Sequence, residues 1–424
     1  MKTLLAQLTN HDKVSAYKIN IHKKESCELF FVKGKLETVR RTDTCDKEVT
    51  VYAIRDGVMG DARFFVYPST TQEDICRLID EAVEKALLIE NPVYTLPGAQ
   101  TGSYQVASNF SDYDPAELAM QVSEAVFVAN TLENGTLNSV EVFINKHTET
   151  VINSYELHKT QVRYDAMVET IPTYNGEEQS VELYHQYNFS TLDMAALRMA
   201  VASKMQEVKG RYEAVQPENI APCKVILGAQ ETSELMWSFA QDLNYSTVYS
   251  HGNLYKKGDT IQNDRLGDPI GITMAGEAEG CVRSAKFDSD GMSLGSIRIV
   301  EDGVAVGYHG SNRFGQYLGE EPTGVLRCLI ADTGSVTQEE LAEGPYLEVV
   351  SMSGLQVDFF TDYIGGEVRL AYYHDGKICR AVTGISISGK LSQVLRTIRL
   401  SKETTVYDSY VGPRQAVLQE MKIF

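Results

Sequence analysis

The sequence predicts an α+β fold, in which an N-terminal α/β region with helices packed on mixed sheets precedes a β-rich C-terminal domain. Residues 15–66 alternate polar and apolar side chains over long stretches, which is typical of strands. Residues 73–87 and 191–209 repeat apolar side chains every three or four positions, which is typical of helices that cover a sheet. Beyond Thr247, short apolar runs alternate with glycine-containing turns, which indicates one or more mixed sheets.

The first part of the chain is expected to form a group of strands. Residues 15–22 and 48–55 alternate regularly. Two short strands are expected within 27–39, on either side of a turn at Gly34, where a positive φ costs little. A further strand is expected at 62–67.

Three helices should pack on these and the following strands. Hydroxyl side chains in 69–72 provide capping groups for the first helix, which should stop at Pro92. Asp114 followed by Pro115 marks the start of the second helix, which is expected to run to Asn134. The third helix spans 191–209, and its expected packing residues are Leu192, Ala195, Leu197, Met199, Ala200 and Met205. Strands are expected between the second and third helices at 138–145, 148–156, 160–171 and 179–189.

Two irregular stretches divide the chain into three predicted regions. Residues 93–112 contain scattered proline and glycine, and residues 213–222 contain two prolines without any periodicity. The predicted regions are 1–100, 101–215 and 219–424. In the last region a buried strand is expected at 224–227, a helix at 231–243, and turns at 290–291, 302–303, 365–366 and 375–376.

Composition limits the classes of partner. The 424 residues include 39 Lys and Arg against 58 Asp and Glu, which gives a formal net charge of −19. Such a surface disfavours direct nucleic-acid binding. The start of the chain lacks the apolar core of a signal peptide, and no run is long enough to span a membrane. Seven scattered cysteines without a CxxC pair are typical of a reducing compartment, so we expect a cytoplasmic protein.

The sequence offers few candidates for a catalytic motif. None of the eight histidines belongs to an HExxH pattern, and each is best interpreted as a surface or core residue. Residues 384–389 (GISISG) alternate like a strand and are not a GxSxG elbow. Residues 288–291 (DSDG) resemble the start of a calcium loop without its later ligands, so a turn is expected. His309, Arg313 and Arg327 are candidates for lining a peptide groove.

Several segments, taken in order, resemble the TldD/PmbA family of metallopeptidases. Each segment alone is weakly specific, but together they cover nearly the whole chain. They are residues 34–37, 56–62, 287–291 (FDSDG), 299–304 (IVEDGV), 307–308, 322–324, 358–360, 373–377 and 387–391 (ISGKL).

The resemblance implies that this chain lacks the zinc site of its TldD-like relatives. Those members carry an HExxxH motif, in which two histidines hold zinc and the glutamate acts as general base, and a cysteine ligand near the C-terminus. An ungapped continuation places Trp237 and Asp242 at the histidine positions and Ser238 at the glutamate position. No cysteine follows Cys379. Trp237 either fills the vacated pocket or, as we favour, simply packs in the helix.

This pattern resembles the PmbA (TldE) branch, and the family resemblance then implies a role as a subunit. Members of this branch pair with a TldD-type subunit, and the pair processes or degrades peptides; the family is also labelled modulator of DNA gyrase. We therefore expect a metal-free, non-catalytic subunit that dimerises with a TldD-like catalytic subunit or with itself, the zinc coming from the partner. Two alternatives stay open: a homo-oligomeric peptide-binding module, and an independent hydrolase whose site comes from distant residues.

Overall fold

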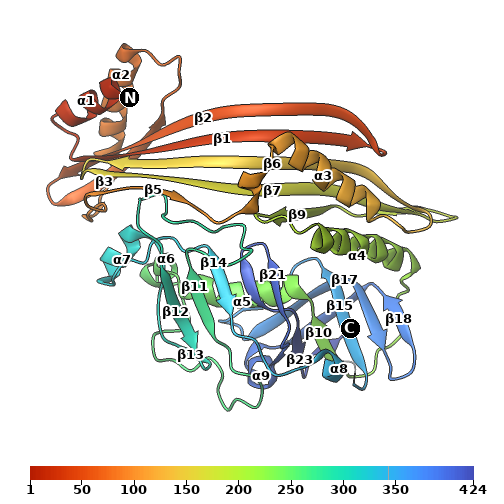
Figure 1. Cartoon of the computed structure of the whole chain (residues 1–424). Helices are drawn as coiled ribbons and strands as arrows, with labels where there is room; N and C mark the ends of the chain where they lie inside the picture. Colours follow the sequence, from red (N-terminus) through yellow and green to blue (C-terminus); the bar gives the residue numbers. More distant parts are fainter. Residues whose placement is uncertain (342) are drawn as a thin grey trace.

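The computed structural model describes residues 1–341 and 343–424 and confirms the predicted α+β fold. Figure 1 shows a long twisted sheet from the N-terminal half lying across a C-terminal region built from two further sheets. None of the helices in these two ranges combines the length and apolarity needed to cross a membrane.

The N-terminal sheet has nine strands, and its central four are unusually long. Its order is β4-β3-β2-β1-β6-β7-β5, with β8 and β9 also paired to β7. Strands from 1–100 and 101–215 share this sheet because β1 pairs with β6 from Lys18–Asn153 to Val32–Ser139. The strands are β1 (Ala16–Val32), β2 (Lys35–Arg55), β3 (Val58–Phe65), β4 (Asn91–Pro92), β5 (Gln100–Gln105), β6 (Gly135–Asn153), β7 (Leu157–Asn175), β8 (Ser180–Glu182) and β9 (His185–Phe189).

The predicted short strands merge into these long ones. The strand predicted at 15–22 continues through a polar stretch at 23–26, because β2 and β6 hydrogen-bond to β1 on both sides there. The predicted strands 138–145 and 148–156 are likewise one strand, β6, whereas 179–189 is split into β8 and β9. Backbone pairing therefore continues where the side-chain alternation is interrupted.

Four helices of eight or more residues pack against the sheet, and the starts of α2 and α3 agree with the predicted signals. Thr71 and Asp74 form a capping box at α2, and Asp114 caps α3 through the amides of Ala116 and Glu117. The helices are α1 (Lys2–Asn10), α2 (Gln72–Ala86), α3 (Pro115–Val128) and α4 (Met194–Glu213), together with a short 3₁₀ turn, η1 (Asn109–Asp112).

The helix ends and one packing prediction need correction. Helix α2 stops at Ala86, well before Pro92, which pairs with β3 as part of β4. Helix α3 stops at Val128, and Asn134 adopts a positive φ in the turn that leads into β6. In α4, Met199 is 68% exposed, and Ala195 is also exposed. The core-facing residues of α4 are Leu197, Val201 and Met205.

The C-terminal region contains two sheets with helix α5 (Ala229–Asp242) between them. One sheet has the order β20-β23-β10-β15-β17-β19-β24, with β16 and β18 also paired to β17; the other has the order β13-β12-β11-β14-β22-β21. The strands are β10 (Lys224–Leu227), β11 (Ile272–Ala275), β12 (Ser296–Glu301), β13 (Val304–Ala305), β14 (Cys328–Ala331), β15 (Tyr346–Met352), β16 (Gln356–Asp358), β17 (Tyr363–His374), β18 (Cys379–Val382), β19 (Ile385–Lys390), β20 (Arg399–Leu400), β21 (Thr404–Tyr407), β22 (Tyr410–Pro413), β23 (Ala416–Leu418) and β24 (Lys422–Ile423). The shorter helices are α6 (Tyr245–Tyr249), α7 (Asn312–Leu318), α8 (Gln338–Leu341) and α9 (Leu391–Thr397).

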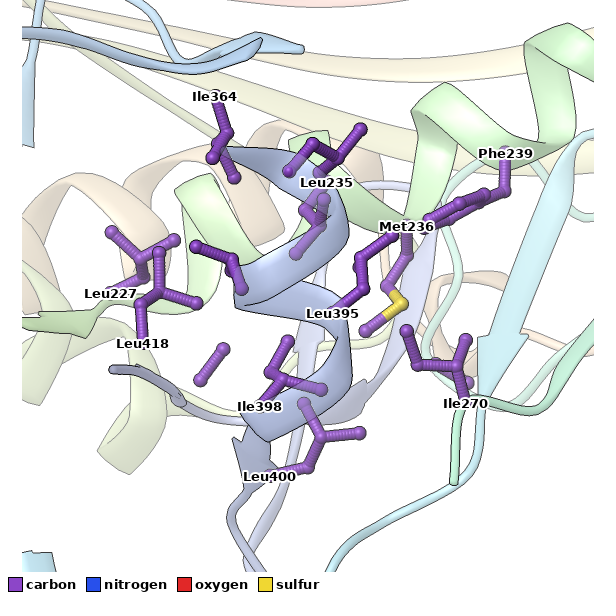
Figure 2. Packing of buried hydrophobic residues seen from close by; sticks show 14 of the residues in the cluster. Leu227, Leu235, Met236, Phe239, Ile270, Ile364, Leu395, Ile398, Leu400 and Leu418 are labelled. Carbon is purple, nitrogen blue, oxygen red and sulfur yellow. The ribbon is translucent and has the colours of Figure 1, made fainter. Parts of the chain in front are cut away.

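The largest core cluster joins α5 to both sheets. Leu235, Met236 and Phe239 of α5 are fully buried in it. Figure 2 shows these side chains beside those of Leu395 and Ile398 at α9. Helix α5, the segment aligned with the family's zinc motif, is therefore a central packing element.

Predicted turns at 302–303 and 375–376 join β12 to β13 and β17 to β18. The turn predicted at 365–366 is wrong, because both glycines lie within β17. A Cβ atom at Gly365 would lie 2.4 Å from the carbonyl oxygen of Ile387, and one at Gly366 would lie 2.5 Å from that of Gly354. These glycines allow close approach of neighbouring backbone.

Candidate functional site

A cleft of about 680 Å³ lies between the N-terminal sheet and loops of the C-terminal region. We call it the central cleft. Strands β1, β2, β3, β6 and β7 supply its polar side, and the other side comes from loops within 283–294 and 325–327 and from the start of α7 at 311–314. Its volume is within the range usual for ligand-binding sites.

The polar character of the β1 side of the cleft follows from the alternation of side chains along the strand. Lys18, Asn20 and His22 on β1 line the cleft, whereas Ile19 is buried in the core beneath α1 and α2. Successive side chains of a strand point to opposite faces. The alternating sequence 15–22 therefore places its polar members in the cleft.

One joint between the two halves of the molecule is the turn at 286–293, which contains the FDSDG segment. Lys159 Nζ on β7 donates to the carbonyl of Gly291 at 2.7 Å and to Ser293 Oγ at 2.8 Å. Gln161 accepts from the amide of Lys286 at 2.8 Å, and Lys18 forms an ion pair with Asp290. The buried polar residues of β1 and β7 thus hold the C-terminal region against the sheet.

Asp288 organises this turn. It is 5% exposed, and its carboxylate accepts from the amides of Asp290 (2.9 Å), Met292 (3.0 Å) and Val325 (2.9 Å). Burial, reinforced by the charge of Asp290, raises the pKa of Asp288, although the amides oppose that rise. The carboxylate therefore connects two loops that line the cleft. The amide of Gly291 donates to the carbonyl of Asp288 at 2.9 Å, which confirms the turn expected at 288–291.

A second joint is formed by α7, which carries Arg313. Asn312 and Gln316 both donate to the carbonyl of Thr95 at 2.8 Å, and Gln316 accepts from the Thr95 amide at 2.9 Å. Arg313 lines the cleft and lies 3.4 Å from Asp61 and 3.1 Å from the hydroxyl of Tyr317. Arg313 is thus both a cleft residue and part of the contact between the two halves.

The structure brings together two of the three candidate groove residues. Arg313 and Arg327 both line the central cleft. His309 lies elsewhere: it is buried, and its Nε2 lies 2.9 Å from the carbonyl oxygen of Ala240 in α5. Burial lowers the pKa of His309. Its ring packs against α5, and the sequence could not place it relative to the two arginines.

A chain of polar groups on the sheet ends at the cleft. His147 Nε2 lies 2.8 Å from Asp165 Oδ2, and His147 Nδ1 lies 2.8 Å from His22 Nε2. Burial opposes ionisation of Asp165, but the contacts with His147 and Asn145 and the charge of Arg163 outweigh it and lower its pKa to about 2. If His147 carries its proton on Nε2, which faces this carboxylate, then its Nδ1 is free to accept a hydrogen bond from His22.

His22 is the end of this chain that lines the cleft. Burial and then the neighbouring His147 and Arg163 lower its pKa, although Glu149 and Asp46 oppose the change. In the tautomer that donates from Nε2 to His147, the neutral His22 ring has an unprotonated Nδ1 that can accept a proton or a hydrogen bond. His22 could not be recognised from the sequence, because His147 and Asp165 lie more than a hundred positions further along the chain.

The three positions aligned with the family's zinc motif are engaged in packing and backbone contacts. Trp237 packs against the main core cluster, as favoured from the sequence. Ser238 donates to the carbonyl of Leu235 at 2.6 Å. The buried carboxylate of Asp242 accepts from the amides of Leu254 at 2.8 Å and Tyr255 at 3.0 Å. An indole, a hydroxyl and a carboxylate already satisfied by two amides do not fit the donor set that zinc requires.

Other residues do not form a metal centre in the part of the chain that the structure describes. Across 1–341 and 343–424, no three His, Cys, Asp or Glu side chains are grouped so that they could hold a metal ion.

Comparison with known proteins agrees with this fold. Residues 221–423 match the profile of the PmbA/TldA metallopeptidase C-terminal domain. The chain is 25% identical over 382 residues to a Haemophilus influenzae protein named Metalloprotease PmbA homolog, which covers 81% of this chain and 80% of that protein.

Two solved structures share the fold over essentially the whole chain. TldE from Thermococcus kodakarensis has a TM-score of 0.78 at 15% identity and covers 100% of this chain and 99% of its own. A candidate modulator of a DNA gyrase from Thermotoga maritima has a TM-score of 0.75 at 16% identity, with the same coverage. The matches support two conclusions: residues 221–423 form a domain of the PmbA/TldA metallopeptidase C-terminal type, and the whole chain shares the fold of TldE.

Proposed function

We propose that this chain is the metal-free, non-catalytic subunit of a TldD/TldE-type metallopeptidase assembly that processes or degrades peptides. The observation that carries the proposal is that Trp237, Ser238 and Asp242 of α5, the residues expected at the zinc-motif positions, are held by packing or by backbone groups. A TldD-like catalytic subunit would supply the zinc. Scattered cysteines and an acidic surface support a cytoplasmic protein that does not bind nucleic acid directly.

In this proposal the central cleft contributes to the peptide chamber. Polar side chains from β1, β6 and β7 face apolar groups such as Phe287 and Phe314 across it. Such a mixture suits a peptide, which presents both backbone polar groups and apolar side chains. The partner is a TldD-like subunit or, in a homodimer, a second copy of this chain.

The decisive experiment measures metal content and peptide cleavage together. The purified chain is analysed for zinc alone and after co-expression with a TldD-type homologue, and both samples are assayed on unfolded peptides. We expect neither zinc nor cleavage from the chain alone, and both from the complex. A complex whose partner has lost its HExxxH histidines is the matched control and should retain assembly without zinc. Stoichiometric zinc in the isolated chain would contradict the proposal.

A second candidate function is an independent hydrolase, which the Asp165–His147–His22 chain favours. An imidazole beside a cleft, linked through a second imidazole to a carboxylate, is a feature of general bases. In that case the isolated chain would cleave peptides, and His22→Gln would abolish the cleavage. Peptide binding without cleavage, partner or zinc would instead indicate a homo-oligomeric binding module.

A further inference from the structure

The cations that line the central cleft fall into two groups, and the first group is neutralised. Each member of this group contacts a carboxylate across or beside the cleft. The pairs are Lys18 with Asp290, Arg163 with Glu149 (3.1 Å) and Asp165 (3.0 Å), Arg313 with Asp61 (3.4 Å), and Arg63 with Glu48 (3.7 Å). These side chains hold the cleft together and have little charge left for a ligand.

Arg283 and Arg327 form the second group. Both line the cleft and are exposed, and neither guanidinium contacts a carboxylate among the described residues. Their backbones are held close together, because Ser284 Oγ lies 3.6 Å from Cys328 Sγ. Two uncompensated guanidinium groups therefore lie on the same wall of the cleft, in a chain whose net charge is −19.

The two acidic residues on the same wall have other partners. Asp290 forms an ion pair with Lys18, and the carboxylate of Asp288 accepts from the amides of Asp290, Met292 and Val325. Burial raises the pKa of Asp288. Among the described residues, the two guanidinium groups on this wall therefore have no direct carboxylate partner.

We propose that Arg283 and Arg327 recognise a carboxylate of a peptide in the central cleft, supplied by its free C-terminus or by an Asp or Glu side chain. This inference rests on the proposed peptide-binding role and adds the chemical class of the ligand. A planar guanidinium presents parallel N–H groups that match the two oxygens of a carboxylate, which a lysine cannot do.

The rest of the cleft has room for the residues adjoining that carboxylate. Phe287, Leu294 and Phe314 line the same space as the two arginines, and the volume of about 680 Å³ exceeds what one carboxylate requires. Apolar side chains of a peptide can pack on these groups while its carboxylate contacts the arginines. A small inorganic anion would leave this apolar surface exposed.

The test compares the binding of fluorescently labelled peptides of one apolar sequence to the full-length chain. One peptide has a free C-terminal carboxylate, one has a C-terminal amide, and one has an amide together with an internal glutamate. Binding is followed by anisotropy at low and high salt. We expect either carboxylate-bearing peptide, or both, to bind about tenfold more tightly than the uncharged amide, with the preference reduced by salt.

The double variant Arg283→Gln/Arg327→Gln should lose this preference and retain the weaker binding of the amide. The control is Arg369→Gln, which removes an exposed arginine of β17 that does not line the cleft. A preference only for the free C-terminus identifies the chain end as the ligand group, whereas a preference only for the glutamate peptide identifies a side chain.

Equal binding of all three peptides, or an unchanged preference in the double variant, would overturn carboxylate recognition. The subunit proposal would still stand if zinc and cleavage appear with the TldD-type partner, because that result does not depend on these arginines. Failure of every peptide to bind would overturn the inference as well.

Discussion

Glu231 should make the stability of this protein fall as the pH rises. It lies in the first turn of α5 and is 2% exposed. Burial, together with the charge of Glu234, raises its pKa to about 7, although its own backbone amide and Lys204 oppose the rise. Lys204 contributes little because its ammonium pairs with Glu207 at 2.6 Å.

The magnitude follows from the difference between the folded and unfolded pKa. A rise from 4.5 to about 7 corresponds to about 3 kcal/mol. Between these two pH values the folded state binds more protons at Glu231 than the unfolded state does. The contribution of Glu231 to the free energy of unfolding is therefore fully present below about pH 4.5. It decreases as the pH rises and is absent above about pH 7.

The perturbation is Glu231→Gln, which keeps the shape of the neutral acid and cannot ionise. We expect the variant to resemble the wild type near pH 4.5 and to be more stable by up to about 3 kcal/mol at pH 8. Thermal denaturation followed by circular dichroism, in steps from pH 4.5 to 8.5, measures the difference. Glu84→Gln, at an exposed position of α2, is the control and should track the wild type.

Two results would refute this reasoning. If the melting temperatures of wild type and Glu231→Gln change in parallel with pH, Glu231 does not carry a raised pKa. If the variant is less stable at pH 8, the charged carboxylate must have a favourable partner that outweighs its burial.

Three other predictions concern packing, the cleft and its pH response. Gly60→Ala should destabilise the protein by about 3 kcal/mol, because the new Cβ would lie 1.8 Å from a backbone oxygen of α2, whereas Gly98→Ala meets no atom within 4 Å and should be neutral in the same thermal denaturation. Asp288→Ala should cost about 3 kcal/mol through three lost amide contacts, and Ser289→Ala, at an exposed neighbour, should cost little; equal melting temperatures would contradict this role. Because burial lowers the pKa of His22, its ring should titrate below pH 6.5 in an NMR titration and stability should fall as the pH drops through that range; a midpoint at or above 6.5 would be inconsistent with the geometry.

The contact between the two halves gives the segment 287–291 a structural role. The segment 287–291 forms the turn that Lys159 and Gln161 hold against the sheet. Its glycine has a φ of +83°, and Lys159 contacts that glycine's carbonyl oxygen. The segment is therefore explained by the contact between sheet and C-terminal region.

The sequence by itself determined the features that depend on neighbouring residues. The caps at Thr71 and Asp114, the apolar face of α2 and the composition of α5 all follow from spacing within one element. The expectation that Trp237, Ser238 and Asp242 stand at the zinc-motif positions likewise comes from the sequence, because it concerns which atoms each side chain can offer.

The tertiary structure alone decided how distant groups meet. The strands of the N-terminal sheet are longer than their alternation indicates, because pairing between β1 and β6 satisfies their backbone where the side chains are polar on both faces. His22 and Asp165 are linked only through His147, and Arg283 and Arg327 share a wall only because their loops are held together. Contacts between residues far apart in sequence leave no local periodicity, so the central cleft emerges only from the folded chain.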